Sequence, residues 1–461
     1  MKLIYQVEDK VAFGPLVVFA IQQLLAIMTA TLVVPIIIGN GMDSAAALFG
    51  AGVGTLIYIL CTGKKSPVFL GSSFAFLSPM AAAFAGAVSA EAGFVGIILG
   101  ALFAGLVYVV IALIVKLVGV AWIDKLMPAV VIGPTVAIIG LSLAGNAVGD
   151  LTTGGFKITQ DIDGAATQVA AASPLLAMVC GLVALFVTIL CSTFGKKTLK
   201  LIPFIIGILA GYLASVIFTL IGNAAGVDAM KVISFDAFTN LTAYGVGLST
   251  FFRVPDFTFL RLTEGLKAID ASYIATIAVA YVPVAFVVFA EHIADHKNIS
   301  SIIERDLLKE PGLHRTLLGD GIGSMVGAFF GGCPNTTYGE SIACVAITKN
   351  ASVYTIFAAS IGAIIISFFS PFIAFVNSIP PCVMGGICMA LYGFIAVSGL
   401  KMVQGVNLNQ NKNLFVVSVI LIAGIGGLTV SFGKITITSV ACALILGIIT
   451  NLMLRGAPEE E

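Results

Sequence analysis

The sequence predicts an all-α polytopic membrane protein with fourteen transmembrane segments, arranged as two inverted repeats of seven segments each. Three observations lead to this prediction: the composition, the apolar runs and the distribution of basic residues. Of the 461 residues, 59% are hydrophobic and only 10% are charged, whereas soluble domains carry roughly 25% charged residues. The mean hydropathy of +1.11 also indicates an integral membrane protein. A formal net charge of zero gives no reason to expect a nucleic-acid partner.

Apolar runs of about the length that a spanning helix needs, roughly 20 residues, lie on both sides of a polar stretch at 222–270. They cover about residues 13–38, 44–62, 67–88, 92–115, 127–148, 174–194, 201–221, 271–296, 316–331, 333–349, 353–377, 380–400, 413–431 and 435–454. The sequence therefore predicts a first repeat at 1–221, an extracellular connector at 222–270 and a second repeat at 271–461.

The basic residues support this count. If the N-terminus is cytoplasmic, 17 of the 23 Lys and Arg residues fall on the cytoplasmic side, as expected for short loops of membrane proteins. The six on the outer side are Lys157, Lys231, Arg253, Arg261, Lys267 and Lys434. We therefore expect a multi-pass protein of the inner (cytoplasmic) membrane, with both termini in the cytoplasm.

The two halves resemble each other weakly. Ser72-Ser73-Phe74, which follows Pro67, is similar to Thr336-Thr337-Tyr338, which follows Pro334. Pro128, Gly133 and Gly140 recur in the same order as Pro381, Gly386 and Gly393. An odd number of spans per half places the two copies in opposite orientations, which is the inverted repeat of many secondary transporters.

Segment 333–349 cannot be an ordinary spanning helix. Pro334 and the preceding glycines interrupt it, and the residues from Asn335 to Thr337 favour strand or turn. A short helix is predicted to begin near Glu340. Backbone that is broken at membrane depth is tolerated where it lines a cavity, and in transporters it indicates the binding site. Its counterpart at 67–79 is predicted to be extended before turning helical near Phe74, so we expect two short strands to pair antiparallel.

Three acids lie within apolar segments, where a charged side chain needs a reason because it costs roughly 2.5–3.5 kcal/mol on insertion scales. Glu291 and Asp295 share one face of the helix predicted at 271–296, and Glu340 lies at the break. A low dielectric favours the neutral form of a carboxyl group. Glu291, Glu340 and Asp295 are therefore predicted to take part in proton coupling, although Asp295 could also be solvated at the helix end, and Glu340 could serve only as a helix cap.

His292 and His296 are spaced for a metal site, but Glu291 precedes the first His, unlike the zinc-protease pattern, and a third ligand is missing. We expect no metal and no cofactor, and we place His296 at the cytoplasmic interface. The eight cysteines mostly lie in apolar runs and indicate buried small side chains. No nucleophile–base pair is recognisable, so the sequence does not predict an enzyme.

The two interrupted segments also supply groups for a ligand. Backbone N–H groups at Phe74 and Gly339 could donate to carbonyl oxygens, and the rings of Phe74, Tyr338 and Tyr392 could form an apolar wall. The alternative is that these aromatic side chains only pack between helices.

At these residues the chain resembles the nucleobase–ascorbate (uracil/xanthine) transporter family, and within it the bacterial uracil permeases. The similarity extends from about residue 13 to 455. The matching stretches are Gly71–Phe76, Ala290-Glu-His292, Asp306-Leu-Leu with Pro311–Arg315, Pro334–Glu340, Val383–Gly386 and Leu391-Tyr-Gly393.

The resemblance implies a core domain of segments 1–4 and 8–11, a gate domain of segments 5–7 and 12–14, and a homodimer. It also implies proton-coupled import of uracil. Carried over by position, Glu291 and Glu340 bind the ring N–H groups, and the amides of Phe74 and Gly339 meet the carbonyl oxygens. Ala30, Tyr338 and Tyr392 then line the pocket.

The chain departs from the family pattern at four positions. Ser341 and Ala343 replace an Asn and a Gly of the signature that follows Glu340. Asp295 stands where these permeases often carry a second His, and Gln23 stands where the first helix usually has His.

The sequence thus predicts a proton-coupled symporter for uracil. One alternative is the same fold with another substrate: xanthine, uric acid, thymine or an anion. A membrane enzyme or a sensor is the alternative from another class. The absence of a GxxxxGK[ST] motif argues against an ATP-driven pump.

Overall fold

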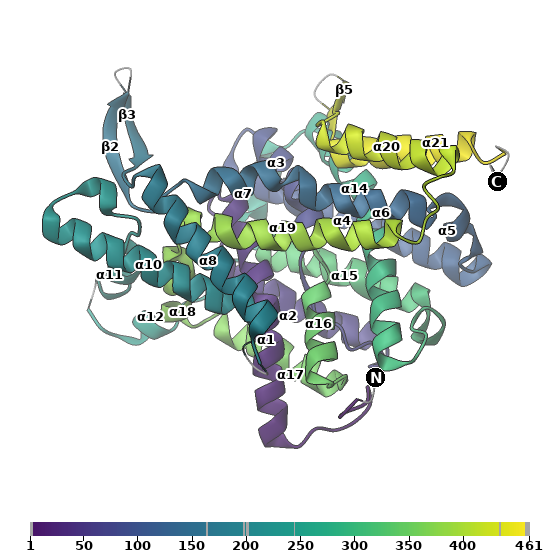
Figure 1. Cartoon of the computed structure of the whole chain (residues 1–461), viewed down its shortest axis with the longest axis horizontal. Helices are drawn as coiled ribbons and strands as arrows, with labels where there is room; N and C mark the ends of the chain where they lie inside the picture. The colour runs from purple at the N-terminus through teal and green to yellow at the C-terminus, as the bar shows by residue number, and fades with distance from the viewer. Residues whose placement is uncertain are drawn as a thin grey trace. The chain divides into compact units, whose positions relative to one another are not determined.

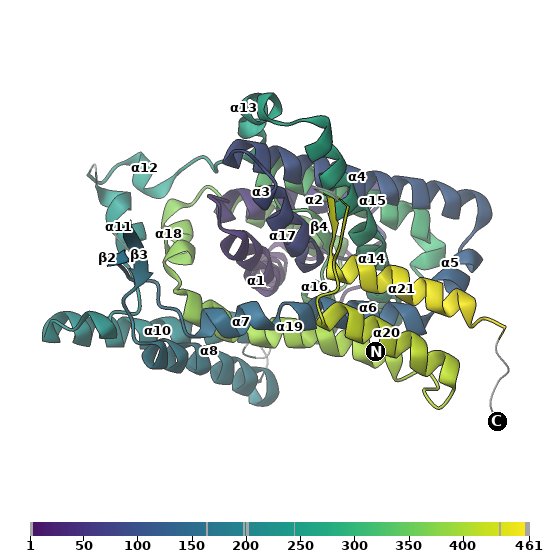
Figure 2. The ribbon, with the colours of Figure 1, turned by 90° about the horizontal axis from the view of Figure 1, so that it is seen from above.

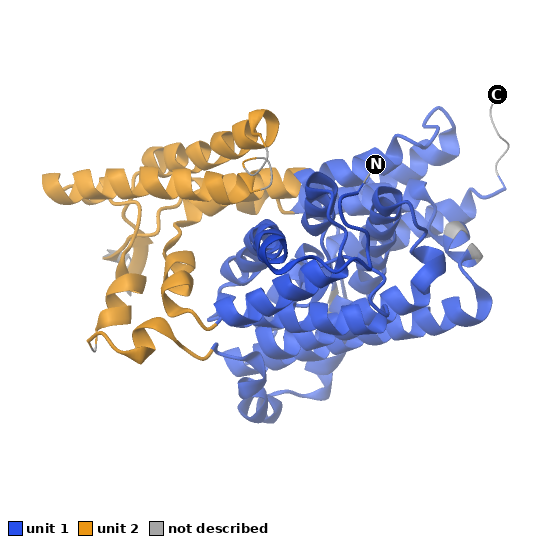
Figure 3. Cartoon of the chain, turned by 90° about the horizontal axis from the view of Figure 1, so that it is seen from below, with its two compact units in different colours: residues 1–142, 255–367, 394–461 blue, residues 143–254, 368–393 orange. Residues whose placement is uncertain are grey.

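The structure, a computed structural model, describes residues 3–162, 165–196, 199, 202–243, 245–432 and 435–456. Lys434, one of the basic residues assigned to the outer side, lies outside these residues. The chain divides into two compact units, which Figure 3 colours separately. Unit 1 comprises residues 1–142, 255–367 and 394–461, and unit 2 comprises residues 143–254 and 368–393. Each unit is described by itself.

Within the described residues, eight helical stretches are long and apolar enough to cross a membrane (Figure 1). They are α1 (Phe13–Ile38), α2 (Ser44–Cys61), α4 (Ala90–Val118), α6 with α7 (Ala129–Ser142, Ala144–Leu151), α8 (Pro174–Phe194), α10 (Pro203–Ala225), α14 (Ala271–Ile303) and α19 (Pro381–Val403). The prediction of a helical multi-pass membrane protein is confirmed. The number of fourteen spans and the inverted repeats stay predictions.

Shorter or less apolar helices occupy the other predicted runs. They are α3 (Leu77–Ala85), α15 (Leu313–Gly331), α16 (Gly339–Thr348), α17 (Val353–Ile366), α18 (Ser370–Ser378), α20 (Asn411–Ile425) and α21 (Ser439–Met453). A short helix, α5 (Ala121–Leu126), precedes α6. Figures 1 and 2 show α20 and α21 side by side, in contact with each other and with α6.

The structure also contains strands and short helical turns that the sequence analysis does not predict. In unit 2, β2 (Lys157–Ile162) and β3 (Ala165–Ala170) form an antiparallel hairpin. In unit 1, β5 (Val430–Phe432) pairs with β6 (Ile435–Ile437). The connector at 222–270 folds into short helical turns, which include α11 (Asp236–Thr239), α12 (Leu248–Phe251) and α13 (Leu262–Gly265).

Helix α14 is longer than predicted, because it continues beyond residue 296 to Ile303. Within this polar tail His296, Ile299 and Ile303 are buried at helical spacing, which is the pattern of an amphipathic helix. The prediction took the exposed face of this helix for the start of a loop. One expectation is therefore wrong: His296 is fully buried and not at an interface. The alternative that places Asp295 at the helix end does not hold either, because α14 continues past it to Ile303.

The predicted strand pair is present. β1 (Leu70–Ser72) and β4 (Asn335–Thr337) run antiparallel, with Leu70 opposite Thr337 and Ser72 opposite Asn335. Every residue of both strands is buried. A 3-10 turn beginning at Phe74 leads from β1 into α3, and α16 begins directly after β4. Since the strands are antiparallel, the two helix starts lie beyond opposite ends of this short ribbon.

Helices α2 and α15 hold the ribbon through closely packed glycines. A Cβ atom on Gly50 would lie 2.6 Å from the carbonyl oxygen of Gly327, and one on Gly54 would lie 2.8 Å from that of Gly323. The side chain of Asn335 in β4 fills the space between these glycines, and its Nδ2 donates to the Gly50 carbonyl (3.2 Å). Small residues at i,i+4 spacing let two membrane helices approach this closely.

Candidate functional site

Three elements of unit 1, α14, β4 and α16, bring the predicted acids together, and Figure 2 shows them side by side. Thr337 at the end of β4 donates a hydrogen bond from Oγ1 to Asp295 Oδ2 (2.8 Å). Glu291 lies one turn earlier on the same face of α14. Glu340 is the second residue of α16. All three carboxylates are half-buried.

The electrostatic surroundings of these acids are negative. Glu291 is within electrostatic range of Asp295, Glu340 and Asp320, and Asp295 is within range of Glu340. Among the described residues, no Lys or Arg side chain acts on Glu291 or Asp295. Like charges this close disfavour one another unless a proton or a donor group lies between them. The cluster suits protons and neutral hydrogen-bond donors better than anions.

The start of α16 offers backbone donors. The first turn of a helix has N–H groups without an intrahelical partner, and Tyr338 at the N-cap position provides no side-chain hydrogen bond. Gly339 is exposed, and a Cβ atom built on it would meet no described atom within 4 Å. Its backbone therefore borders open space next to Glu340.

The other predicted contact residues of unit 1 are buried near the ribbon. Phe74 opens the turn before α3, and Ala30 lies in the buried middle of α1. The ring of Tyr338 lies against Gly71, where an added Cβ would be 2.4 Å away, and its hydroxyl donates to the Ser72 carbonyl (2.7 Å). This side chain fastens β4 to β1, which agrees with the packing alternative for this aromatic residue.

Tyr392 lies in α19, within unit 2, and is buried there. Its predicted place beside the acids of unit 1 stays a prediction.

Two positions at which the chain departs from the family pattern contact each other. Gln23 in α1 donates from Nε2 to Ser341 Oγ (2.7 Å) and to the Ser341 carbonyl (3.2 Å). The N–H of Phe69, just before β1, donates to the same hydroxyl oxygen (3.0 Å). Gln23 and Ser341 are 2% and 0% exposed. Because Ser341 directly follows Glu340, this cluster fixes the first turn of α16.

Sequence reasoning missed a fourth buried acid, Asp320 in α15. Its Oδ2 lies 2.7 Å from His292 Nδ1, and the other ring nitrogen of His292 lies 3.0 Å from Thr316 Oγ1. The side chains of His292 and Asp320 are fully buried. The signal was available: Asp320 stands inside a predicted span, and the same cost applies to it as to Glu291.

His296 belongs to a second buried chain of hydrogen bonds. Its Nδ1 donates to the His292 carbonyl (2.8 Å), so its Nε2 can accept from the Tyr58 hydroxyl (2.7 Å). That hydroxyl is also 2.7 Å from Ser66 Oγ. The two imidazole rings stack with centroids 4.0 Å apart. In the described part of the chain, no group of three or more His, Cys, Asp or Glu side chains could hold a metal ion.

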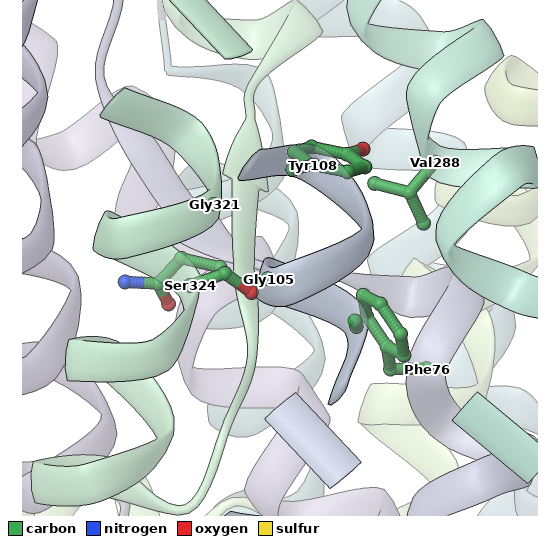
Figure 4. Close-up of a pocket in the computed structure, with 8 residues that line it drawn as sticks. Phe76, Gly105, Tyr108, Val288, Gly321 and Ser324 are labelled. Atoms are coloured by element: carbon green, nitrogen blue, oxygen red, sulfur yellow. The ribbon is translucent and has the colours of Figure 1, made fainter. Parts of the chain in front are cut away.

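Unit 1 also contains two cavities. Figure 4 shows a cavity of about 10 Å³, with Tyr108, Val288 and Phe76 around one side and Ser324 on the opposite side. It has room for about one water molecule. A larger cavity of about 600 Å³ lies between the α3–α4 loop and the start of α14, lined in part by Asp270 and Tyr273. Their lining residues do not include any predicted site residue.

The chain has many apolar helices, and its acids Glu291, Asp295 and Glu340 lie beside an interrupted segment. These features are typical of a multi-pass membrane transporter. A sequence model of the Permease family matches residues 14–432, and the chain belongs to this family. It is a transporter and not an enzyme.

The chain is 37% identical to the uracil permease of Bacillus caldolyticus over 461 residues, covering 99% of this chain and 96% of the relative. It is also 37% identical to the uracil permease of Bacillus subtilis, covering 96% of this chain and 93% of that protein. Among solved structures, the transmembrane domain of a cyanobacterial bicarbonate transporter, BicA, is similar in fold, with a TM-score of 0.54. That similarity covers 97% of this chain and all of the other, at 14% identity.

Proposed function

We propose that this protein imports uracil across the cytoplasmic membrane together with protons. The observation that carries the proposal is the meeting of Glu291, Asp295 and Glu340 around the start of α16, without a basic group among their described electrostatic neighbours. The full-length similarity to proteins named uracil permeases supports the choice of substrate.

The chemistry of the cluster matches the edge of a pyrimidine. Uracil is uncharged and offers two ring N–H donors and two carbonyl acceptors. The carboxylates of Glu291 and Glu340 accept from the ring N–H groups, and the amides of Gly339 and Phe74 donate to the carbonyl oxygens. Ala30 and Tyr338 line the pocket. The carboxylates of Glu291, Asp295 and Glu340 would repel an anion, which disfavours the anion alternative.

Proton coupling follows from the same acids. When one of Glu291, Glu340 or Asp295 takes up a proton, the repulsion within the cluster falls, and a neutral ligand then binds more tightly. By linkage, the ligand raises the affinity for the proton by the same factor. Movement of a gate domain (segments 5–7 and 12–14) against a core domain (segments 1–4 and 8–11) then exposes the site to either side.

The wider architecture belongs to the same proposal. It comprises two inverted repeats at 1–221 and 271–461, a homodimer, and both termini in the cytoplasm.

The test is uptake of labelled uracil in cells that lack their own permease. We expect wild-type cells to accumulate uracil, and a protonophore to reduce accumulation to equilibration. Glu291→Gln and Glu340→Gln should each abolish accumulation. The matched control is Glu264→Gln, since Glu264 is exposed and pairs only with Lys267 at the surface. Normal accumulation by both site variants would refute the site.

A competition panel decides the substrate. Unlabelled xanthine, uric acid and thymine are added in excess to labelled uracil. We expect uracil alone to compete fully. Stronger competition by a purine or by thymine would transfer the proposal to that nucleobase, which is the second candidate.

A further inference from the structure

Residues 4–9, which we call the N-terminal strap, are hydrogen-bonded to the loop that follows α16. The N–H of Ile4 donates to the Lys349 carbonyl (2.7 Å), that of Ala351 to the Tyr5 carbonyl (3.0 Å), and that of Val353 to the Val7 carbonyl (2.9 Å). Tyr5 and Asn350 form a parallel β-bridge. The strap therefore runs beside the loop and bends in a turn at Val7 and Glu8, where the N–H of Asp9 donates to the Gln6 carbonyl (3.2 Å).

Side chains also connect the strap to the rest of unit 1. Val7 is completely buried, whereas the neighbouring Ile4 is 62% exposed. Ser352 donates from Oγ to the Asp9 carbonyl (2.6 Å). The ring of Tyr5 meets that of Phe19 in α1 edge to face, with centroids 6.0 Å apart. The strap thus lies on the surface of unit 1 and is anchored to its core through Val7.

The N-terminal strap contacts the C-terminal ends of α14 and α16, the two helices that carry the acids. Lys349, which caps α16, has a φ of 56°, and Glu304, which caps α14, has a φ of 55°. Left-handed backbone is uncommon for residues other than glycine. Arg305, next to Glu304, donates to the carboxylate of Glu8 in the strap. The guanidinium of Arg305 lowers the pKa of the Glu8 carboxyl through this hydrogen bond, so the pair stays charged at neutral pH.

We propose that the N-terminal strap fastens the ends of α14 and α16 to each other and thereby positions Glu291 against Glu340. Ile303, the last residue of α14, lies roughly 18 Å along the helix from Glu291, and Thr348, the last residue of α16, lies roughly 12 Å from Glu340, at 1.5 Å per residue. Helices transmit a displacement at one end to the other, so a loosened strap misplaces the carboxylates without touching the ligand. Val7, Glu8 and Arg305 are then positioning residues.

This inference rests on the proposed function, and charge reversal tests it. Glu8→Arg and Arg305→Glu should each raise the KM for uracil about two- to fivefold at unchanged maximal rate, because an exposed ion pair couples weakly. The double variant restores the pair in reverse and should restore the KM. A double variant whose KM is no better than that of the worse single variant would overturn the proposal.

A second comparison uses the strap's own two faces. Val7→Ser exposes a polar group to the buried face and should raise the KM at least fivefold. Ile4→Ser changes the exposed face and should leave the KM within twofold of wild type. Equal KM values for these two variants would also overturn the proposal.

The melting temperature of the purified protein separates the two levels of inference. Measured without ligand, the melting temperature should fall for Val7→Ser and not for Ile4→Ser. It should also be higher for the charge-reversed double variant than for Glu8→Arg or Arg305→Glu alone. If wild-type cells take up no uracil, the proposed function fails, and these melting temperatures alone decide whether the strap fastens the helices. Equal melting temperatures for the Val7→Ser and Ile4→Ser proteins would then refute it.

Discussion

The hydrogen bonds of Gln23 predict a graded loss of substrate affinity in the variant Gln23→Met. Methionine has nearly the volume of glutamine but cannot donate, so Ser341 loses the bonds of 2.7 and 3.2 Å. Two such bonds are worth about 1–3 kcal/mol together. Gln23 Oε1 is itself buried without a partner among the described residues, and its removal offsets part of this loss.

We therefore expect a net cost of about 1 kcal/mol at the first turn of α16, which corresponds to roughly a fivefold change in an equilibrium constant. The assay is the initial rate of labelled uracil uptake over a range of concentrations, corrected for the amount of protein in the membrane. The KM should rise about fivefold, while the maximal rate stays within twofold, because Glu340 itself is retained.

Gln22 provides the matched control. It is the adjacent glutamine of α1, it is half-buried, and its Oε1 also has no partner within the described chain. Gln22→Met should leave the KM within twofold of wild type. The effects of Gln23→Met and Ser341→Ala should be less than additive, because both changes remove the 2.7 Å bond between the two side chains, although Ser341→Ala also removes the acceptor of the Phe69 N–H. Equal effects of Gln22→Met and Gln23→Met, or a KM for Gln23→Met within twofold of wild type, would refute the reasoning.

Three further predictions concern two glycines, the buried pair of His292 and Asp320, and the hydrogen bond between Thr337 and Asp295. Gly327→Ala should prevent stable folding, seen as loss of a monodisperse peak, because its Cβ would lie 2.3 Å from Asn335 Nδ2. Gly339→Ala has open space and should fold normally but bind uracil more weakly. Asp320→Leu should lower the melting temperature, since it leaves the buried His292 Nδ1 without its partner at a cost of about 1–3 kcal/mol, and His292→Phe in addition should recover part of it. Thr337→Val removes the 2.8 Å hydrogen bond to Asp295 and should shift the pH profile of uptake. The control Thr316→Val should leave the pH profile unchanged.

Most of the helical framework was predictable, because apolar runs of spanning length leave a chain few alternatives. The runs at 13–38 and 174–194 coincide with α1 and α8 to the residue. The break at 333–349 was also predictable, since Pro334 and the polar residues after it exclude a continuous helix. The antiparallel pairing of β1 with β4 followed from the internal similarity, and it is confirmed.

Features that depend on tertiary contacts were not predictable from local pattern. The tail of α14 is polar on one face, and only burial of the other face makes it a helix. Asp320 lies in the predicted span 316–331, but its partner His292 is on another helix, so no local pattern indicates the pair. The orientation of Tyr338 depends on the absence of a side chain at Gly71, which lies far away in the sequence. Hydrophobic periodicity carries no information about such partners.

The pairing of β1 with β4 has a consequence for how the protein is made. Leu70 lies in the first third of the chain, whereas Thr337, its partner, is synthesised much later. Until the second strand is synthesised, the Phe69 carbonyl and the Ser73 N–H lack the partners that they have in the folded chain, the Tyr338 N–H and the Pro334 carbonyl, and unpaired amides are costly in a bilayer. The nascent protein must therefore keep the unpaired first strand away from the lipid. Its ligand-binding site can form only late, after the second strand has been made.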